Sequence, residues 1–215
     1  MAEVHVVCAE NRHLYDDVLD DYFRARHRVY IDESRWMELE KPDGREIDQF
    51  DGPTTVYIIA LEGRRVVGSQ RMVPSCGPTL MGDVFPQLAA GRGLVRRPDA
   101  YELSRMFVVR DRRGDAAHPH IESLVMAGTM EYGLTEGIRQ FTIVMETWSI
   151  PRFLNMGWKV RPLGLPVDIA GMNCVGVVLD VNMRAWRDTL RTRSVAGPVL
   201  VWNELKTARP ASRVA

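Results

Sequence analysis

The sequence predicts an α/β fold in which a mixed central sheet is flanked by helices on both faces. Two β-rich runs, 56–61 and 66–73, are joined by a turn-like tetrapeptide, which indicates an early antiparallel hairpin. Later in the chain, β-rich and helical patterns alternate as strand–helix–strand units. Because 46% of the 215 residues are hydrophobic, a chain of this length can bury a full core. We therefore expect a single domain over residues 1–206 and a disordered tail over 207–215.

The first half of the chain is expected to supply four strands and one long helix. Apolar residues recur at three- and four-residue steps between Leu14 and Arg26, which indicates an amphipathic helix. Residues 34–53 lose this periodicity and gain proline and glycine, so we expect a loop long enough to favour a functional role. Pro86 excludes a long helix over 80–88. The runs that predict strands are 4–8, 56–61, 66–73 and 101–109.

The second half alternates helical and β-rich segments. Apolar residues on one face predict a helix over 118–137, and Asn182 is a suitable N-cap for another helix over 182–193. A short helix over 150–156 is expected to end at Gly157. The remaining runs predict strands at 141–145, 158–162 and 175–181, with a last short segment at 199–205.

The charge balance and hydropathy exclude several classes of protein. Lysine and arginine number 28, as do aspartate and glutamate, so the composition creates no long-range field for nucleic acid or anionic lipid. No stretch approaches the ~18 to 20 apolar residues of a membrane span, and the first residues lack the pattern of a secretion signal. We therefore expect a cytoplasmic protein that binds neither nucleic acid nor membrane.

The nucleophilic and metal-binding motifs of common enzyme classes are absent. The sequence has no phosphate-binding G-x-x-x-x-G-K-[ST] loop, no G-x-S-x-G elbow and no H-E-x-x-H helix. Cys8, Cys76 and Cys174 are widely separated and odd in number, so neither a disulfide framework nor a zinc site is supported. We interpret the three cysteines as small buried or half-buried apolar residues.

Three carboxylates, Glu46, Asp48 and Asp51, lie within six residues of the long loop. Hard cations bind such oxygen ligands, but the run lacks the full calcium-loop pattern, so we predict no metal. Charge balance with three arginines is the better use of this cluster. Such a group of opposite charges could hold a zwitterionic amino acid by its ammonium and carboxylate groups. The arginines concerned are Arg26, Arg71 and Arg105.

Arg71 and Arg105 lie in separate β-rich runs, and Glu102 precedes Arg105 by three residues. Side chains alternate along a regular strand, so residues 102 and 105 would face opposite sides of the sheet. Both reach one cleft only if the strand has a bulge near Ser104, a feature often found beside active sites. Structural salt bridges between the acidic loop and the arginines are an equally good alternative.

Aromatic and apolar side chains suggest the remaining walls of a site. Trp36, six residues after Tyr30, could present its face to a cationic ligand. A second group could line an apolar pocket, although ordinary core packing explains its members as well. This group comprises Met145, Trp148, Phe153 and Leu154.

Taken together, the motifs resemble those of the acyl-homoserine-lactone synthases, the LuxI-type autoinducer synthases of bacterial quorum sensing. The order and spacing of five segments over about residues 22–110 are similar to those of the family. These segments are RHRVY followed by Trp36, EIDQFD at 46–51, GSQR at 68–71, GPTLMGDVFPQL at 77–88 and YELSR at 101–105.

The resemblance implies a fold like that of the GNAT N-acetyltransferases, with a mostly antiparallel sheet. It also implies that the α-amine of S-adenosylmethionine is acylated by an acyl thioester, after which the methionine carboxylate closes the lactone and methylthioadenosine leaves. S-adenosylmethionine is then a substrate, and no cofactor is needed. Residues implied to bind it are Arg26, Tyr30, Trp36, Glu46, Asp48, Asp51, Arg71 and Arg105.

Carried over by motif, Glu102 is the candidate general base, acting through a water. Ser104 and Arg105 are the other candidate catalytic residues, and backbone amides near Ser104 to Phe107 would stabilise the oxyanion if that strand is bulged. The expected acyl pocket comprises Met106, Phe107, Met145, Thr147, Trp148 and Phe153.

The acyl donor is left open by the sequence. The acidic first helix looks similar to the subgroup that makes branched-chain or aryl lactones from coenzyme A thioesters, so acyl-CoA is the expected partner. Acyl carrier protein is the alternative, because Arg152, Lys159 and Arg161 could contact an acidic carrier. Other readings are a GNAT-type N-acyltransferase acting on another amine, or a binding module that retains only the scaffold.

Overall fold

The computed structural model describes residues 2–114 and 121–202, and its strands form one nine-stranded sheet. Strands pair in the order β6-β8-β5-β4-β3-β2-β1-β9, and β7 also pairs with β8. Only β4 with β5 and β1 with β9 are parallel, so the sheet is mixed and mostly antiparallel, as predicted. The strands are β1 Glu3–Val7, β2 Val56–Glu62, β3 Arg65–Pro74, β4 Ala100–Val108, β5 Gln140–Glu146, β6 Val160–Pro162, β7 Val167–Ile169, β8 Met172–Asp180 and β9 Leu200–Val201.

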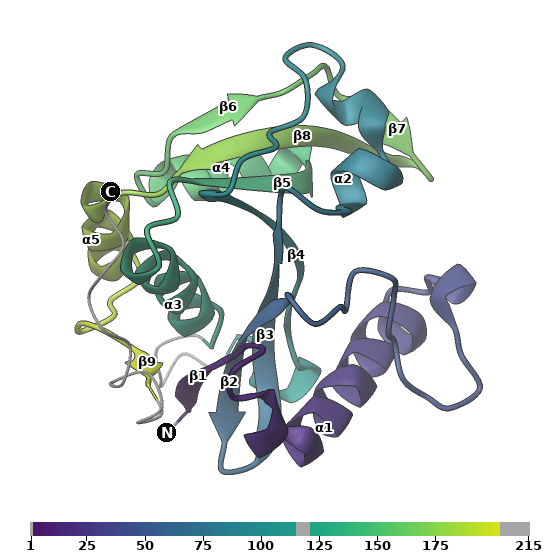
Figure 1. Ribbon diagram of the computed structural model, residues 1–215, viewed down its shortest axis with the longest axis vertical. Helices are drawn as coiled ribbons and strands as arrows, with labels where there is room; N and C mark the ends of the chain where they lie inside the picture. Colours follow the sequence, from purple (N-terminus) through teal and green to yellow (C-terminus); the bar gives the residue numbers. More distant parts are fainter. Residues whose placement is uncertain (1, 115–120, 203–215) are drawn as a thin grey trace.

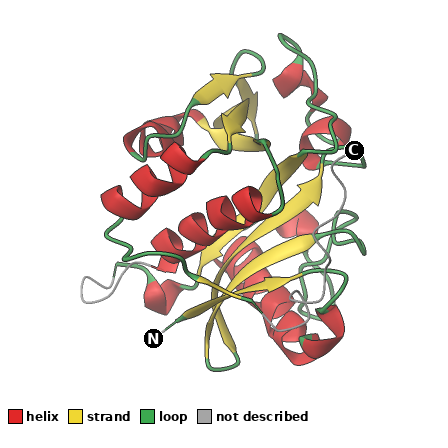
Figure 2. Ribbon diagram, turned by 60° about the vertical axis from the view of Figure 1, so that its left-hand side comes forward, coloured by secondary structure: helices red, strands yellow, loops and turns green. Residues whose placement is uncertain are grey.

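Helices cover both faces of the sheet (Figures 1 and 2). In Figure 1, α1 lies on one side of the sheet, and α3 and α5 lie on the other. The α-helices are α1 Asp16–His27, α2 Leu80–Asp83, α3 Ile121–Thr135, α4 Ile150–Asn155 and α5 Met183–Thr192. No helix in the described residues is long and apolar enough to cross a bilayer.

The element boundaries agree with the sequence predictions within a few residues. The side chain of Asn182 accepts a hydrogen bond from the amide of Ala185 and caps α5, and Gly157 follows α4 with a φ of +77°. The three-residue strand β7 was not predicted, because it is too short to show a period. Cys76 is exposed, contrary to expectation, whereas Cys8 and Cys174 are buried. The predicted tail over 207–215 lies outside the described residues.

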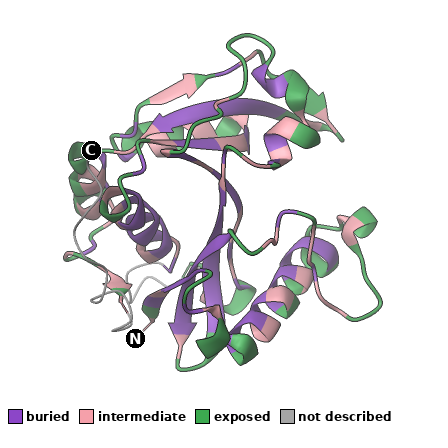
Figure 3. Cartoon of the chain, in the orientation of Figure 1, coloured by how far each residue is buried: buried purple, intermediate pink, exposed green. Residues whose placement is uncertain are grey.

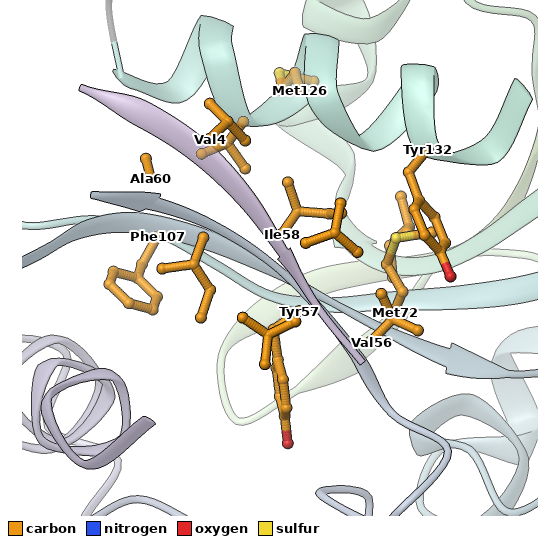
Figure 4. Packing of buried hydrophobic residues seen from close by; sticks show 14 of the residues in the cluster. Val4, Val56, Tyr57, Ile58, Ala60, Met72, Phe107, Met126 and Tyr132 are labelled. Carbon is orange, nitrogen blue, oxygen red and sulfur yellow. The ribbon is translucent and has the colours of Figure 1, made fainter. Parts of the chain in front are cut away.

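The core fills the space between the sheet and α3 and continues beneath α1. Val4, Ile58 and Met126 are among the buried side chains that join β1, β2 and α3 (Figure 4). Figure 3 shows the central strands and most of α3 as buried. Gly128 allows α3 to approach β1 closely, because an added Cβ would lie 2.9 Å from Leu200 Cδ2 and 3.0 Å from Val4 Cγ1.

Two irregularities position the functional site. The parallel pairing of β4 with β5 runs only from Ala100↔Gln140 to Leu103↔Ile143, although both strands continue, so the sheet opens between them. A π-helical turn, Arg28–Glu33, extends α1 and carries Tyr30 toward the end of β4. Such turns are frequent at functional sites.

We predict that Gly128→Val lowers the free energy of unfolding by about 1–3 kcal/mol, because the branched side chain overpacks the contact between α3 and β1. Urea denaturation measures this loss. Gly197→Ala is the control, since a Cβ there meets nothing within 4 Å. Equal stability of the two variants would contradict the prediction.

Candidate active site

Three arginines and three carboxylates converge on the α1 side of the sheet, as the charge pattern predicts. Arg26 comes from the buried face of α1, where it follows Tyr22 by one helical turn, and its guanidinium lies over the Tyr22 ring at 5.4 Å. Arg71 comes from β3 and Arg105 from β4. The carboxylates come from the loop that precedes β2. We call these six residues the ion cluster: Arg26, Glu46, Asp48, Asp51, Arg71 and Arg105.

The hydrogen bonds of the ion cluster form a continuous network. Arg26 donates to Glu46 at 2.5 Å and to Asp51 at 2.7 Å. Arg71 holds both oxygens of Asp48, at 2.5 and 3.0 Å. Arg105 donates to Glu46 twice at 3.0 Å and to Asp48 at 2.9 Å. Salt bridges between loop and arginines are therefore present, as one alternative predicts, and they converge on one site.

Local turns bring the three carboxylates together. Asp48 accepts a hydrogen bond from the amide of Phe50 at 2.9 Å, and Asp51 accepts one from the amide of Asp48 at 2.9 Å. The amide of Glu46 donates to the carbonyl of Phe23 at the end of α1. Short acidic side chains favour such turns, because they accept hydrogen bonds from nearby backbone amides.

The arginines keep the carboxylates ionised. Burial raises the pKa of Glu46, but the hydrogen bonds and charges of Arg105 and Arg26 outweigh it, so the net pKa is lowered. Asp51 behaves in the same way: burial raises its pKa, and Arg26 and Arg71 hold it well below the ordinary value. Glu46 and Asp51 are thus charged in the folded protein at neutral pH.

Tyr30 and Trp36 form one aromatic wall beside the ion cluster. Their rings stack with centroids 5.1 Å apart, and the guanidinium of Arg105 lies 5.3 Å from the Tyr30 ring. The Tyr30 hydroxyl donates to the carbonyl of Met106 at 3.0 Å. These contacts connect the π-helical turn to β4.

β4 is bulged next to Ser104, which is the irregularity that a shared cleft for residues 102 and 105 requires. Arg71 pairs with Ser104 and Ser69 with Phe107, so one residue of β3 faces two residues of β4. Arg105 has a φ of +51° at this point. Its side chain therefore reaches the same ion cluster as Arg71, whose Nε donates to the Ser104 hydroxyl at 3.0 Å.

Glu102 lies on the same face of β4 as the ion cluster, but its carboxylate accepts hydrogen bonds from a different segment of the chain. Its two carboxylate oxygens accept hydrogen bonds from the amides of Leu80 at 2.6 Å and Met81 at 3.0 Å. Burial raises its pKa, and these backbone hydrogen bonds only partly offset the effect. The contact was not predicted from sequence, although the segment 77–88 was noted as a motif.

An apolar cavity of about 170 Å³ lies between α3 and the opened part of the sheet. Of the expected acyl-pocket residues, Met106, Met145 and Phe153 line it. Phe107, Thr147 and Trp148 do not. β5 ends at Glu146, so Trp148 lies on the outer turn and is 68% exposed. Lining residues that sequence analysis missed are Gln70, Leu103, Glu122, Met126, Thr129, Ile143, Ser149 and Trp158.

A wider hollow adjoins this cavity. Tyr30, Phe107 and Arg113 are among its lining residues, and it extends between the π-helical turn and the amino end of α3. Met106, Glu122 and Arg152 line both spaces. Glu122 and Arg152 form an ion pair that joins α3 to α4. The two spaces therefore share a wall at the bulge of β4. Within residues 2–114 and 121–202, no three histidine, cysteine, aspartate or glutamate side chains are arranged so that they could hold a metal ion.

We predict that acid destabilises the protein through the ion cluster. Carboxyls whose pKa is lowered on folding bind protons more readily when unfolded, so their stabilisation is present above the unfolded pKa values of about 4 and is lost below them. The free energy of unfolding should fall between pH 5 and pH 3, by roughly 1–3 kcal/mol. Urea denaturation at each pH measures it. Asp51→Asn should show a smaller fall, and an equal fall would contradict the assignment.

Comparison with known proteins identifies the same family as the sequence motifs. The autoinducer synthase family matches residues 10–188. Isovaleryl-homoserine lactone synthase of Bradyrhizobium diazoefficiens is 45% identical over 190 residues, which span 88% of this chain and 84% of that protein. The structure of BjaI, a CoA-dependent acyl-homoserine lactone synthase with SAM and isopentyl-CoA, aligns with a TM-score of 0.87 and 41% identity over 94% of this chain and 93% of that one.

A more distant structure supports the fold alone. An N-acetyltransferase from Lactobacillus plantarum aligns with a TM-score of 0.54 and 16% identity over 84% of this chain and 99% of that one. The fold is thus similar to that of GNAT enzymes, as the sequence motifs imply. The family match and the 45% identity show that this chain belongs to the autoinducer synthases, the acyl-homoserine-lactone synthases, and is an acyltransferase.

Proposed function

We propose that this synthase transfers a short branched acyl group from coenzyme A to S-adenosylmethionine. The observation that carries the proposal is the shared wall between a wide hollow, lined by both apolar and charged side chains, and a small apolar cavity. This wall is formed by Met106, Glu122 and Arg152. The hollow and the ion cluster would receive S-adenosylmethionine, and the cavity would receive the acyl chain. The thioester carbonyl would then lie at the junction.

The reaction consists of two displacements. After the α-ammonium of S-adenosylmethionine loses a proton, its nitrogen attacks the thioester carbonyl carbon. The carbon–sulfur bond of the thioester then breaks, the nitrogen gives up a second proton to the leaving coenzyme A thiolate, and an amide and free coenzyme A result. A carboxylate oxygen of the acylated product then attacks the γ-carbon. The bond from that carbon to sulfur breaks, the lactone closes and methylthioadenosine leaves. S-adenosylmethionine is consumed as a substrate, and the proposal includes no cofactor.

Glu102 is the proposed proton acceptor, acting through a water. Its raised pKa makes it a stronger base than an ordinary carboxylate, and the amides of Leu80 and Met81 hold both of its oxygens in place. The buried position beside Arg71 and Ser104 places it on the same face of β4 as the ion cluster.

The backbone of Ser104 to Phe107 is the proposed oxyanion site. β4 has no hydrogen-bonded neighbour on its β5 side beyond Leu103 in the described residues, so its outer peptide groups border the opened part of the sheet. Preorganised amides of this kind stabilise the charge that develops on a thioester oxygen. Ser104 and Arg105 set the conformation of this segment.

The ion cluster, Tyr30 and Trp36 are proposed to hold S-adenosylmethionine. Asp48 and Arg105, the members of the cluster that keep some exposed surface, offer both signs of charge to its ammonium and carboxylate, and the four buried members hold these two in place. The stacked aromatic rings offer a face to its sulfonium. Because the arginines are already paired with carboxylates, the cluster also fixes the geometry of the site.

Cavity size supports a small acyl group. An apolar cavity of ~150 Å³ in a protein core admits a molecule the size of benzene. The cavity here, about 170 Å³, therefore suits a short branched chain or a single ring better than a long straight chain. A branched acyl group is favoured because the relative at 45% identity is an isovaleryl-homoserine lactone synthase. Coenzyme A is favoured over acyl carrier protein as the donor because BjaI, at 41% identity, is CoA-dependent.

Purified protein tests the proposal directly. S-adenosylmethionine is incubated with isovaleryl-CoA, benzoyl-CoA and octanoyl-CoA, and with isovaleryl- and octanoyl-acyl carrier protein. Methylthioadenosine is measured by chromatography and the lactone by mass spectrometry. We expect the fastest release with isovaleryl-CoA. Thioester consumption without methylthioadenosine would instead indicate acylation of another amine, and a preference for acyl carrier protein would overturn the choice of donor.

Met145→Ala should change acyl selectivity. The truncation enlarges the cavity, so the ratio of kcat/KM for octanoyl-CoA to that for isovaleryl-CoA should rise about tenfold or more. Trp148→Ala is the matched control, because this exposed side chain does not line the cavity. An unchanged ratio in Met145→Ala would show that the acyl chain binds elsewhere.

Glu102→Gln should reduce kcat by about 10²–10⁴-fold, because the proton acceptor is removed. The substitution should also lower the stability of the fold. The NH₂ group of glutamine would face one of the two backbone N–H groups that Glu102 binds, and an NH₂ group cannot accept that hydrogen bond. Glu131→Gln controls for this effect, since Glu131 is a half-buried carboxylate with a raised pKa that also accepts backbone hydrogen bonds, here from Val199 and Leu200. Turnover and thermal midpoint are measured for both, and similar kcat values would remove Glu102 from the proposed role.

A further inference from the structure

The bulge of β4 is held by side chains from both faces of the sheet. On the cavity side, Gln70 Nε2 donates to the carbonyl of Ser104 at 2.7 Å and to the carbonyl of Arg71 at 3.1 Å. On the other side, the Tyr30 hydroxyl donates to the carbonyl of Met106 at 3.0 Å. The carbonyls of Ser104 and Met106, the residues on either side of Arg105, are thus both hydrogen-bonded to side chains.

Chemistry fixes the orientation of the Gln70 amide. Carbonyl oxygens only accept hydrogen bonds, so the atom that lies between two of them must be the NH₂ nitrogen. Both of its hydrogens are used. The side chain is 5% exposed and lies among the apolar lining residues of the small cavity. A buried primary amide is costly there unless it is hydrogen-bonded, which ties Gln70 to this arrangement.

The bulge needs such support. Gln70 is the one residue of β3 that faces two residues of β4, Arg105 and Met106. Arg105 has a φ of +51°, a conformation that non-glycine residues adopt rarely and keep only when several contacts enforce it. The carbonyl held by Gln70 belongs to the peptide group directly before Arg105. Loss of that hydrogen bond would free this peptide to rotate.

A change in the conformation of this peptide would alter both the small cavity and the wide hollow. Met106 follows Arg105 and lines the small cavity as well as the wide hollow. A rotated peptide before Arg105 would displace Met106 and the neighbouring amides from the junction of the two spaces. The guanidinium of Arg105 is independently anchored by Glu46 and Asp48, so the ion cluster would be affected less.

We propose that Gln70 is a positioning residue for acyl transfer. Its hydrogen bond to the Ser104 carbonyl holds the bulge in the conformation that presents Met106 and the adjacent backbone amides to the thioester carbonyl. Gln70 acts through the backbone of β4 and touches none of the reacting atoms. This inference rests on the proposed function, because it assumes that the thioester carbonyl lies at the bulge.

The first test compares Gln70→Met with Ser69→Ala. Methionine has a similar length and no donor, whereas the Ser69 hydroxyl is buried on the same strand and has no hydrogen-bond partner among the described residues. We expect Gln70→Met to lower kcat by about tenfold to a hundredfold, with KM for S-adenosylmethionine and the thermal midpoint little changed. Ser69→Ala should retain the kcat of the wild type. A purely structural role would lower the midpoint and leave kcat unchanged.

A second variant tests the donor itself. In Gln70→Glu, an ionised carboxylate faces two carbonyl oxygens and cannot donate, whereas the protonated carboxyl can donate one hydrogen bond. The ratio of its kcat to that of the wild type should therefore rise as the pH falls, and the ratio for Gln70→Met should stay constant. Glu122 and Arg152 line the same cavity, and Arg105 and Glu46 lie across the strand, but these groups are common to all three proteins.

The outcomes separate this inference from the proposed function. Wild-type kcat in Gln70→Met, or a pH-independent ratio in Gln70→Glu, would overturn the role of Gln70 while methylthioadenosine release by the wild type still supports the synthase. If Gln70→Met does not fold, the pH dependence of Gln70→Glu decides the question. Absence of methylthioadenosine release by the wild type would overturn both.

Discussion

The pairing of three guanidinium groups with three carboxylates is the interaction on which the site depends. Arg26 and Arg71 have no exposed surface, and a buried charge is tolerated only when hydrogen-bonded partners surround it. The cluster therefore requires α1, the long loop, β3 and β4 to meet at one point. Removing one partner would leave an unpaired charge in the interior, so the six residues act as a unit and the site has little freedom to change shape.

Two departures from regular sheet geometry shape the site together with the ion cluster. The bulge at Arg105 changes the alternation of side chains along β4, so Glu102, Ser104 and Arg105 all serve one face while Leu103 lines the cavity on the other. The loss of pairing between β4 and β5 beyond Leu103 opens the space beside this segment. A regular sheet with the same residues would divide the proposed catalytic groups between two faces and would close the cavity proposed for the acyl chain.

Sequence patterns predicted the features that depend on local chemistry. The hairpin, the helices and the convergence of charges from the 26–51 and 71–105 segments follow from periodicity, turn residues and charge balance. Contacts set by tertiary distances were not predictable. Glu102 meets the amides of Leu80 and Met81 because a loop returns over β4, and nothing in either segment indicates this. Trp148 lies outside the cavity because it stands on the turn that follows β5. Gln70 and Trp158 were missed because strand alternation does not identify which neighbour encloses a cavity.

The apolar wall of the small cavity also bears on side reactions. Thioesters hydrolyse when water reaches the carbonyl. The exposed surface of this cavity is apolar, although polar residues are among those that line it, so it offers water few hydrogen-bond partners. An activated acyl group seated there would be shielded until the amine arrives. The surface proposed to limit the length of the acyl chain would then also protect the donor from hydrolysis.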